Sequence, residues 1–117
     1  IIKFIKPLGL FDYISLQKNA FVVLSDSGSL TEEASILNFP AVSIRTSTER
    51  PEGIDVGSIV LGQINTESIV QSIEISTKSE LAGTPLEYNL KNNSDKIARV
   101  IQSYTPIINK EIWNKSE

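Results

Sequence analysis

The stretch FVVLSDSGSLTEEASILNFPAVSI, residues 21–44, decides the fold. It opens with four apolar residues, 21–24, a run that is typical of a strand buried on both faces of a sheet. A polar loop follows, and apolar residues then recur at helical spacing over residues 30–37. Asn-Phe-Pro at 38–40 ends this helix, and residues 41–44 again have the apolar character of a strand. A strand, a helix and a strand in this order predict a βαβ unit with parallel strands.

The same alternation extends on both sides of this stretch. Short apolar runs predict two more strands, at residues 1–5 and 58–61. Asp12 is suited to cap a helix over residues 13–19. Right-handed crossovers place helices on both faces of a parallel sheet. The expected fold is therefore α/β, a Rossmann-like, doubly wound parallel sheet.

The carboxyl-terminal half of the chain has two more helical patterns. Thr66 is expected to cap a helix that ends near residue 75, and residues 76–93 are polar enough for a long loop. The last segment, residues 94–117, opens with a serine that suits a helix start, and Pro106 is expected to kink or break this helix. Apolar residues mark one face of this segment before the proline: Ile97, Val100, Ile101 and Tyr104.

Composition narrows the classes of function. The 117 residues, 40% of them apolar and 21% charged, suit one domain over residues 1–117. A net charge of −3 argues against a nucleic-acid partner, and no apolar run approaches the about 18 residues of a membrane span. The absence of cysteine and histidine removes thiolate chemistry and the commonest general base. The acidic residues show no metal-ligand spacing, so we expect no metal, no cofactor and no catalytic set. There is no methionine even at position 1, which suggests a piece of a longer protein.

The loop after the first strand of the βαβ unit is a candidate anion site. Ligands bind beyond the carboxyl ends of parallel strands, and Ser27, Gly28 and Ser29 lie there, at the start of a helix. Gly28 permits close backbone approach, and the free N–H groups of a helix start suit a phosphate. The alternative is a capping box between Ser29 and Glu32, which needs no ligand.

Glu33 lies beside the buried stripe of the same helix. A carboxylate there is suited to accept hydrogen bonds from the two hydroxyls of a ribose. The alternative is an ordinary solvated helix residue. Tyr13 presents a similar choice, between stacking on a base and packing at the rim of the core. Trp113 is expected to anchor the last helix.

A second loop, residues 45–53, lies after the next strand. Pro51 is expected to stiffen it and to hold Arg50 in an extended conformation. The planar guanidinium of Arg50 would then complete a diphosphate site, because its fork matches phosphate oxygens. The alternative is a surface salt bridge with Glu49 or Glu52, worth about 0–1 kcal/mol.

Three motifs in one order resemble a known family. They are D-S-G-S-L-T-E-E-A at 26–34, F-P-A-V at 39–42 and E-R-P-E-G at 49–53. The chain resembles the non-hydrolysing UDP-N-acetylglucosamine 2-epimerases, whose motifs read D-S-G-G-x-x-E-E, G-x-P and E-R-P-E. The similarity is good over residues 2–75 and loose beyond. Residues P-L-G at 7–9, D-Y at 12–13 and S-I-L-N-F-P at 35–40 look most like the capsule and O-antigen branch, some members of which act on UDP-2-acetamido-2,6-dideoxy-L-hexoses.

The resemblance implies a role for each candidate residue. Ser27, Gly28 and Ser29 would meet the phosphates of a UDP-sugar, Glu33 the ribose hydroxyls, and Arg50 the diphosphate. Two further residues would border the uracil, Leu8 and Tyr13. Ser29 departs from the family, which often has a second glycine there, but serine still offers its backbone N–H.

The resemblance also implies the setting of this chain. It would be most of the carboxyl-terminal domain of a two-domain, cytoplasmic enzyme of the GT-B type. The partner domain, amino-terminal to it, would carry the acidic residues and the histidine that move protons. The whole protein would be a homodimer that expels UDP to give a 2-acetamidoglucal and adds it back with C2 inverted. The chain alone would bind UDP without catalysis, and no metal or nicotinamide is implied.

Two other functions share these features. A nucleotide-sugar glycosyltransferase of the GT-B fold would use a similar cradle for UDP, although the E-R-P-E loop favours the epimerase. A non-enzymatic α/β module would have the same loops as turn and surface features, and it would not bind UDP.

Overall fold

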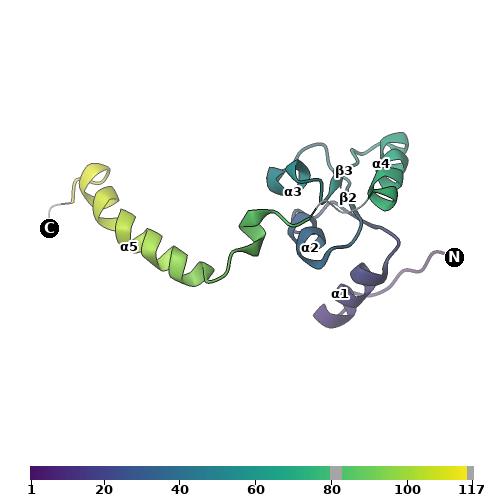
Figure 1. Ribbon diagram of the computed structural model, residues 1–117, viewed down its shortest axis with the longest axis horizontal. Helices are drawn as coiled ribbons and strands as arrows, with labels where there is room; N and C mark the ends of the chain where they lie inside the picture. Colours follow the sequence, from purple (N-terminus) through teal and green to yellow (C-terminus); the bar gives the residue numbers. More distant parts are fainter. Residues whose placement is uncertain (80–82, 116–117) are drawn as a thin grey trace.

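The computed structural model describes residues 1–79 and 83–115 and has an α/β fold (Figure 1). Three short strands form a parallel sheet in the order β1-β2-β3: β1 Val23–Ser25, β2 Ala41–Ser43 and β3 Val60–Leu61. The central strand pairs Val42 with Leu24 on one side and with Val60 on the other. The βαβ order expected from the sequence is confirmed.

Helices cover both faces of the sheet. Figure 1 shows α2 (Leu30–Leu37) and α3 (Pro51–Asp55) on one side of the strands and α4 (Thr66–Lys78) on the other. The α2 helix has the limits that its apolar spacing predicts, and Asn38 ends it in the left-handed conformation, with φ 57°. Short polar residues such as asparagine tolerate that conformation best among residues with a Cβ.

The core lies between α2 and the sheet. Leu30, Ala34 and Phe39 are at most 2% exposed, and Ala41 and Val42 of β2 are fully buried. Strand β2 is therefore buried on both faces. Such burial was predicted for residues 21–24, and for β1 the prediction is wrong, because Leu24 is 41% exposed. The described helices leave the face of β1 that carries Leu24 open to solvent.

The amino-terminal prediction is also wrong. Residues 1–9 have no regular secondary structure, and their side chains are exposed. A strand needs a hydrogen-bonded neighbour, and residues 1–9 pair with none of the strands in the described chain. Helix α1 (Leu10–Asn19) starts two residues before Asp12, with Gly9 at its N-cap, so Asp12 lies in the first turn instead of capping it.

Two other expected loops contain helical turns. Pro51 opens the five-residue α3 inside the expected 45–53 loop, a position where proline's fixed φ and missing N–H suit a helix. Residues 76–93 were expected to form a loop, but α4 continues to Lys78 and a 3-10 helix, η1, covers Leu86–Asn89. Residues 80–82 of that expected loop lie outside the described residues.

Helix α4 starts with a different cap from the one expected. Asn65 is its N-cap residue, and its side chain accepts a hydrogen bond from Ser68 N–H at 2.9 Å. Thr66 is instead the first helical residue. Asparagine is at least as good an N-cap as threonine, and it comes first in the chain.

The last helix, α5 (Asn93–Glu111), extends away from the sheet (Figure 1). Pro106 does not break it. Gln102, whose carbonyl loses its helical donor to the proline, is exposed, so that carbonyl can bond to water. Apolar side chains along α5 are exposed, including Ile101, Tyr104 and, beyond the helix end, Trp113 at 61%. Among the described helices, none is long and apolar enough to cross a bilayer.

Candidate functional site

The loop after β1 lies at the carboxyl edge of the sheet and leads into α2. Its short polar side chains bond within the loop: Ser27 N–H donates to Ser25 Oγ at 3.0 Å, and the Ser27 and Ser29 hydroxyls are 3.0 Å apart. Carbonyls of the loop accept from the first residues of α2. Within the described chain, the amides of Gly28 and Ser29 have no such partner. Two neighbouring free amides at a helix start make an anion site.

The capping box between Ser29 and Glu32, the alternative to an anion site, does not form. Ser29 has helical dihedral angles, φ −67° and ψ −14°, and its side chain does not cap a backbone amide. Its hydroxyl donates instead to Glu33 Oε1 at 2.9 Å. Glu32 turns the other way, to Arg50. Both carboxylates of the first turn are thereby engaged by side chains around the loop.

Arg50 lies over the start of α2. Its Nε donates to Glu32 Oε1, which leaves the two Nη groups available. A Cβ atom placed on Gly28 would stand 2.5 Å from Arg50 Nη1, so the guanidinium fills the space that glycine leaves open. The hydrogen bond and the charge of Glu32 raise the pKa of Arg50 above its ordinary value. The residue therefore keeps its positive charge beside the free amides.

The predicted surroundings of Arg50 are partly wrong. Its φ of −130° is that of an extended residue before proline, but its ψ of 72° is lower. The alternative of a surface ion pair with Glu49 or Glu52 is also wrong, because Glu32 is the partner. Glu49 pairs with Arg45, to which both of its oxygens bond at 2.9 Å. That hydrogen bonding lowers the pKa of Glu49.

Arg45 was not identified from the sequence as a site residue. Its Nη1 would stand 3.7 Å from a Cβ on Gly28, so two guanidinium groups approach the same glycine. Arg45 lies two residues after β2, at the edge of the sheet where ligands bind, so its position in the sequence could have identified it. A second guanidinium group therefore lies beside Gly28, although Glu49 balances its charge.

Glu33 is half-buried and connects α1 to α2. Its Oε2 accepts from Tyr13 Oη at 3.1 Å and from Gln17 Nε2, and Ser29 holds its Oε1. The alternative of a solvated helix residue is therefore wrong. Burial, and then the negative charge of Glu33, raise the pKa of Tyr13.

The two remaining residues near this carboxylate differ in burial. Gln17 is 4% exposed and is the buried residue of α1. The sequence analysis missed it, because a glutamine is normally an exposed residue. Leu8 lies two residues before α1 and is 40% exposed. The structure thus brings Tyr13, Glu33 and the 27–29 loop together, whereas Leu8 lies on the exposed segment before α1.

A family model described as UDP-N-acetylglucosamine 2-epimerase matches residues 1–102. The chain belongs to the UDP-N-acetylglucosamine 2-epimerase family. A UDP-N-acetylglucosamine 2-epimerase of Methanococcus maripaludis is 46% identical over 79 residues, which are 68% of this chain and 22% of that protein. The chain therefore spans only about a fifth of the length of this epimerase.

Solved structures of epimerases have the same fold. The UDP-N-acetylglucosamine 2-epimerase of Rickettsia bellii is 40% identical, with a TM-score of 0.82 over 97% of this chain and 32% of that one. The Methanocaldococcus jannaschii UDP-GlcNAc 2-epimerase in complex with UDP-GlcNAc and UDP is 32% identical, with a TM-score of 0.72 over 85% of this chain and 27% of that one.

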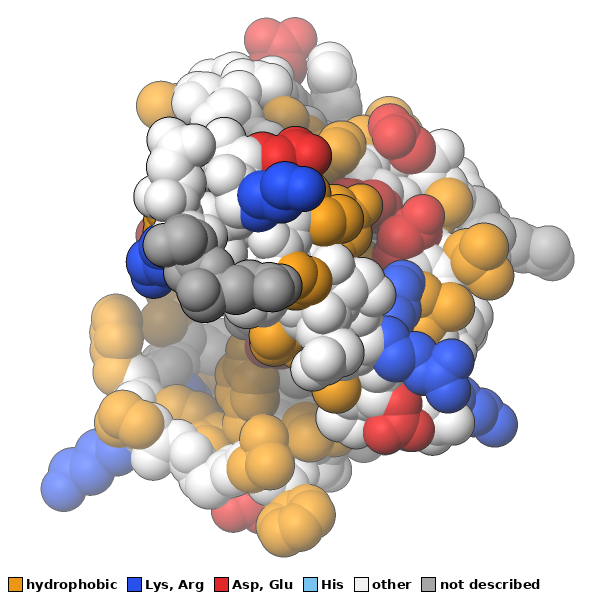
Figure 2. Space-filling view, turned by 90° about the vertical axis from the view of Figure 1, so that its left-hand side faces the viewer, with side chains coloured by type: hydrophobic (Ala, Val, Ile, Leu, Met, Phe, Trp, Pro, Cys, Tyr) orange, Lys and Arg blue, Asp and Glu red, His pale blue; other side chains and the backbone are white. Residues whose placement is uncertain are grey.

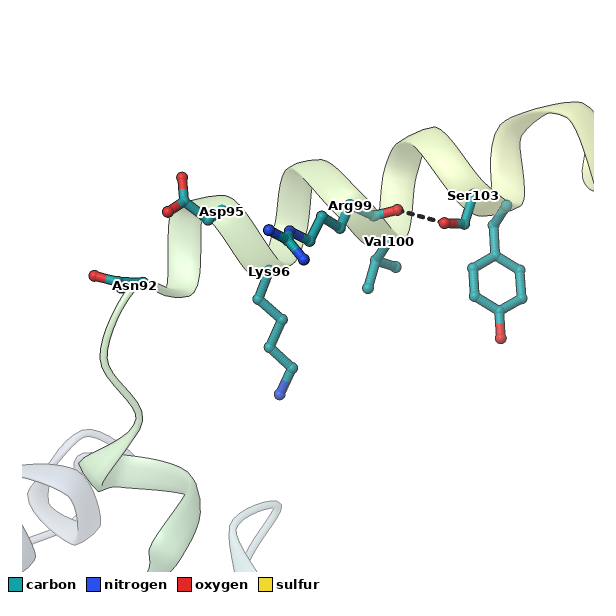
Figure 3. A pocket seen from close by; sticks show the side chains of 7 residues that line it. Asn92, Asp95, Lys96, Arg99, Val100 and Ser103 are labelled. Carbon is teal, nitrogen blue, oxygen red and sulfur yellow. Dashed lines mark hydrogen bonds between the residues drawn. The ribbon is translucent and has the colours of Figure 1, made fainter.

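A hollow in the described chain lies away from this site, along α5. It measures about 460 Å³, and only α5 and its N-cap residue line it. Figure 3 shows Lys96 and Val100 pointing to one side of the helix while Asp95 points to the other. A hollow lined by a single helix has no opposing wall in the described chain, so it does not make a site. Nor do the described residues contain a group of three or more acidic side chains that could hold a metal.

Proposed function

We propose that this chain holds the UDP part of a UDP-sugar in a UDP-N-acetylglucosamine 2-epimerase. The observation that carries the proposal is the position of Arg50 against Gly28, beside two free amides at the start of α2. Two anion-binding devices, a helix start and a guanidinium, thus converge on one spot. The complex of the Methanocaldococcus relative with UDP-GlcNAc and UDP supports the choice of ligand.

Each part of UDP has a complementary group in this proposal. The diphosphate lies on the amides of the 27–29 loop and under Arg50. The ribose hydroxyls bond to Glu33, and the uracil lies near Tyr13 and Leu8. A carboxylate has about four lone-pair sites, and three protein donors already occupy Glu33. The second ribose hydroxyl therefore exchanges with one of them, and the exposed Tyr13 is the easiest to displace.

The share of this chain in the reaction is electrostatic. In the proposed reaction of the whole protein, C2 of UDP-N-acetylglucosamine loses a proton as the bond from C1 to the diphosphate oxygen breaks. UDP then adds back to the 2-acetamidoglucal with C2 inverted, which gives UDP-N-acetylmannosamine. Arg50 and the free amides stabilise the charge on the leaving diphosphate. Residues 1–117 contain no histidine, so in this proposal the groups that move the proton come from another part of the whole protein.

Substrate and setting form the finer part of the proposal. The whole protein acts in the cytoplasm, in capsule or O-antigen synthesis, on UDP-N-acetylglucosamine or on a UDP-2-acetamido-2,6-dideoxy-L-hexose. The exposed apolar face of α5 packs on the amino-terminal domain of a homodimeric enzyme. Figure 2, with the α5 end toward the viewer, shows apolar side chains exposed among charged ones. Such a patch is typical of an interface.

Calorimetric titration of this chain with UDP tests the proposal. We expect saturable binding, which Arg50→Ala and Glu33→Ala each weaken by about tenfold or more, the effect of one charge-assisted hydrogen bond. Arg99→Ala is the matched control, because this exposed arginine lies on α5. UDP that lacks the ribose 2′-hydroxyl isolates the role of Glu33: it should bind more weakly to the unmutated chain and equally to Glu33→Ala. Equal binding by all variants would refute the assignment.

A further inference from the structure

Two buried polar atoms near Arg50 lack hydrogen-bond partners in the described chain. One is Glu32 Oε2, on the carboxylate whose other oxygen holds Arg50. The second is the hydroxyl of Tyr88. Leaving a buried polar atom unpaired costs about 1–3 kcal/mol, and more for a charged group. Glu32 Oε2 can accept a hydrogen bond and the Tyr88 hydroxyl can donate one. Two such unpaired atoms beside one ion pair therefore call for a functional explanation.

The fold brings Tyr88 to the face of α2 that carries Glu32. Thr84 Oγ1 donates to Ser35 O at 2.7 Å, and Pro85 is buried, so the segment before η1 is fixed on α2. Tyr88 N–H then closes the 3-10 turn by donating to Pro85 O at 3.1 Å. Glu32 and Ser35 are three residues apart and share one face of the helix. The η1 turn thus carries Tyr88 over the Glu32 side of α2.

The charges around Tyr88 agree with this placement. Burial, and then the negative charges of Glu32 and Glu52, raise its pKa, while Arg50 opposes them and Glu87 adds a smaller effect. A tyrosine with a raised pKa is neutral at pH 7, and a neutral hydroxyl has a hydrogen to donate. Glu32 as a carboxylate can only accept.

We propose that Tyr88 is a positioning residue for Arg50 and acts through Glu32. Its hydroxyl donates to Glu32 Oε2 through one bridging water, since neither atom has a direct partner in the described chain, and this bridge fixes the plane of the carboxylate. Oε1 then holds Arg50 at Nε, so that Nη1 faces the anion site at Gly28. The inference rests on the proposed function, because it assigns to Arg50 the diphosphate of UDP.

The test uses Tyr88→Phe, which removes only the hydroxyl, and Tyr104→Phe on α5 as the matched control. The first readout is the Arg50 Nε–H resonance in a nitrogen-15 spectrum of this chain. We expect Glu32→Gln to shift it strongly and Tyr88→Phe to shift it and speed its exchange with water. The second readout is the pKa of Tyr88, followed by carbon-13 labelling of tyrosine, which Glu32→Gln should lower. Tyr104→Phe should change neither, and no ligand is needed.

The third readout is UDP affinity, measured on the whole protein. We expect Tyr88→Phe to weaken binding by about threefold to tenfold with an unchanged melting temperature, a loss smaller than that of Arg50 itself because the effect is indirect. In a Glu32→Ala background, adding Tyr88→Phe should have no further effect on UDP affinity, since the side chain that links Tyr88 to Arg50 is gone.

The outcomes separate this inference from the proposed function. UDP binding that Tyr88→Phe leaves unchanged, with an unmoved Arg50 resonance, would overturn the positioning role and leave the proposed function standing. A whole protein that binds no UDP, although Tyr88 and Glu32 are coupled in the spectra, would overturn the proposed function.

Discussion

The guanidinium of Arg50 covers Gly28, with Nη1 2.5 Å and Cζ 3.4 Å from the place where a Cβ atom on that glycine would stand. Arg50 and Gly28 are 22 positions apart in the sequence. The parallel sheet places both at the carboxyl edge, one after β1 and the other after β2. Position 28 therefore needs a glycine, because a side chain there would occupy the space of the guanidinium. A substitution at Gly28 should displace Arg50.

Gly28→Ala should weaken UDP binding by about tenfold, the loss of one charge-assisted contact. The methyl group meets the far end of a flexible side chain, so the guanidinium moves and the backbone does not. The free energy of unfolding should change by no more than about 0.5 kcal/mol. Calorimetry and urea unfolding measure the two effects. Gly9→Ala is the control, because a Cβ there meets nothing within 4 Å. Full UDP affinity in Gly28→Ala would mean that the arginine is not a ligand.

Gly53→Ala should destabilise the chain instead. A Cβ on this buried residue of α3 would collide with Thr31 Cγ2 on α2 and stand 3.3 Å from Ser58 Oγ. Both neighbours are buried, so the packing between α2 and α3 has to open, at a cost of about 1–3 kcal/mol. Urea unfolding measures the loss. An unchanged free energy of unfolding would show that α3 is not packed as described.

Alkaline pH should destabilise the chain through Tyr13. Burial and Glu33 raise its pKa above the ordinary 10.0, so the folded state keeps this proton longer than the unfolded state does. The resulting stabilisation is complete below pH 10 and is lost as the pH rises through the folded pKa. Free energies of unfolding in urea from pH 8 to 11 measure it. Tyr13→Phe should make the free energy of unfolding depend less on pH. Part of the dependence should remain, because the pKa of Tyr88 is also raised. A curve that Tyr13→Phe leaves equally steep would contradict this view.

Deleting residues 93–117 should leave the sheet intact. Side chains of α5 are exposed, except for two that are half-buried near its end, and the core lies entirely before residue 60. The free energy of unfolding should change by no more than about 0.5 kcal/mol, like that of a surface substitution. Phe39→Ala, at a residue 1% exposed, should cost about 3–5 kcal/mol and serves as the contrast. A comparable loss on deletion would mean that α5 packs on the core in solution.

Local patterns predicted much of the fold, because the elements concerned bury one regular face. The spacing of Leu30, Ala34 and Leu37 predicted both ends of α2, and the apolar run at 41–44 predicted the central strand. The sequence motifs also identified residues that the structure brings together, namely Gly28, Glu33 and Arg50. Where the surroundings of a residue depend on its own helix or strand, the sequence alone predicted them.

The errors concern partners that only the tertiary fold supplies. Local spacing allowed a capping box between Ser29 and Glu32, but Glu32 instead accepts a hydrogen bond from Arg50, 18 positions later in the chain. Gln17 and Tyr88 are polar residues that belong to no motif. Gln17 is held by Glu33 of α2, and η1 packs on α2, so that both residues have a buried polar atom. Residues 1–5 have strand character, but strand formation depends on a neighbour.

The amide resonances of Gly28 and Ser29 give the most direct test of the central claim. In a nitrogen-15 spectrum of this chain, UDP should shift both of them, because each N–H gains a phosphate oxygen as acceptor. Uridine, which has no phosphate, should leave them in place. Arg50→Ala should weaken the UDP shift in proportion to its lost affinity. A folded chain in which saturating UDP leaves both amides unmoved would contradict the account of this loop as the diphosphate site.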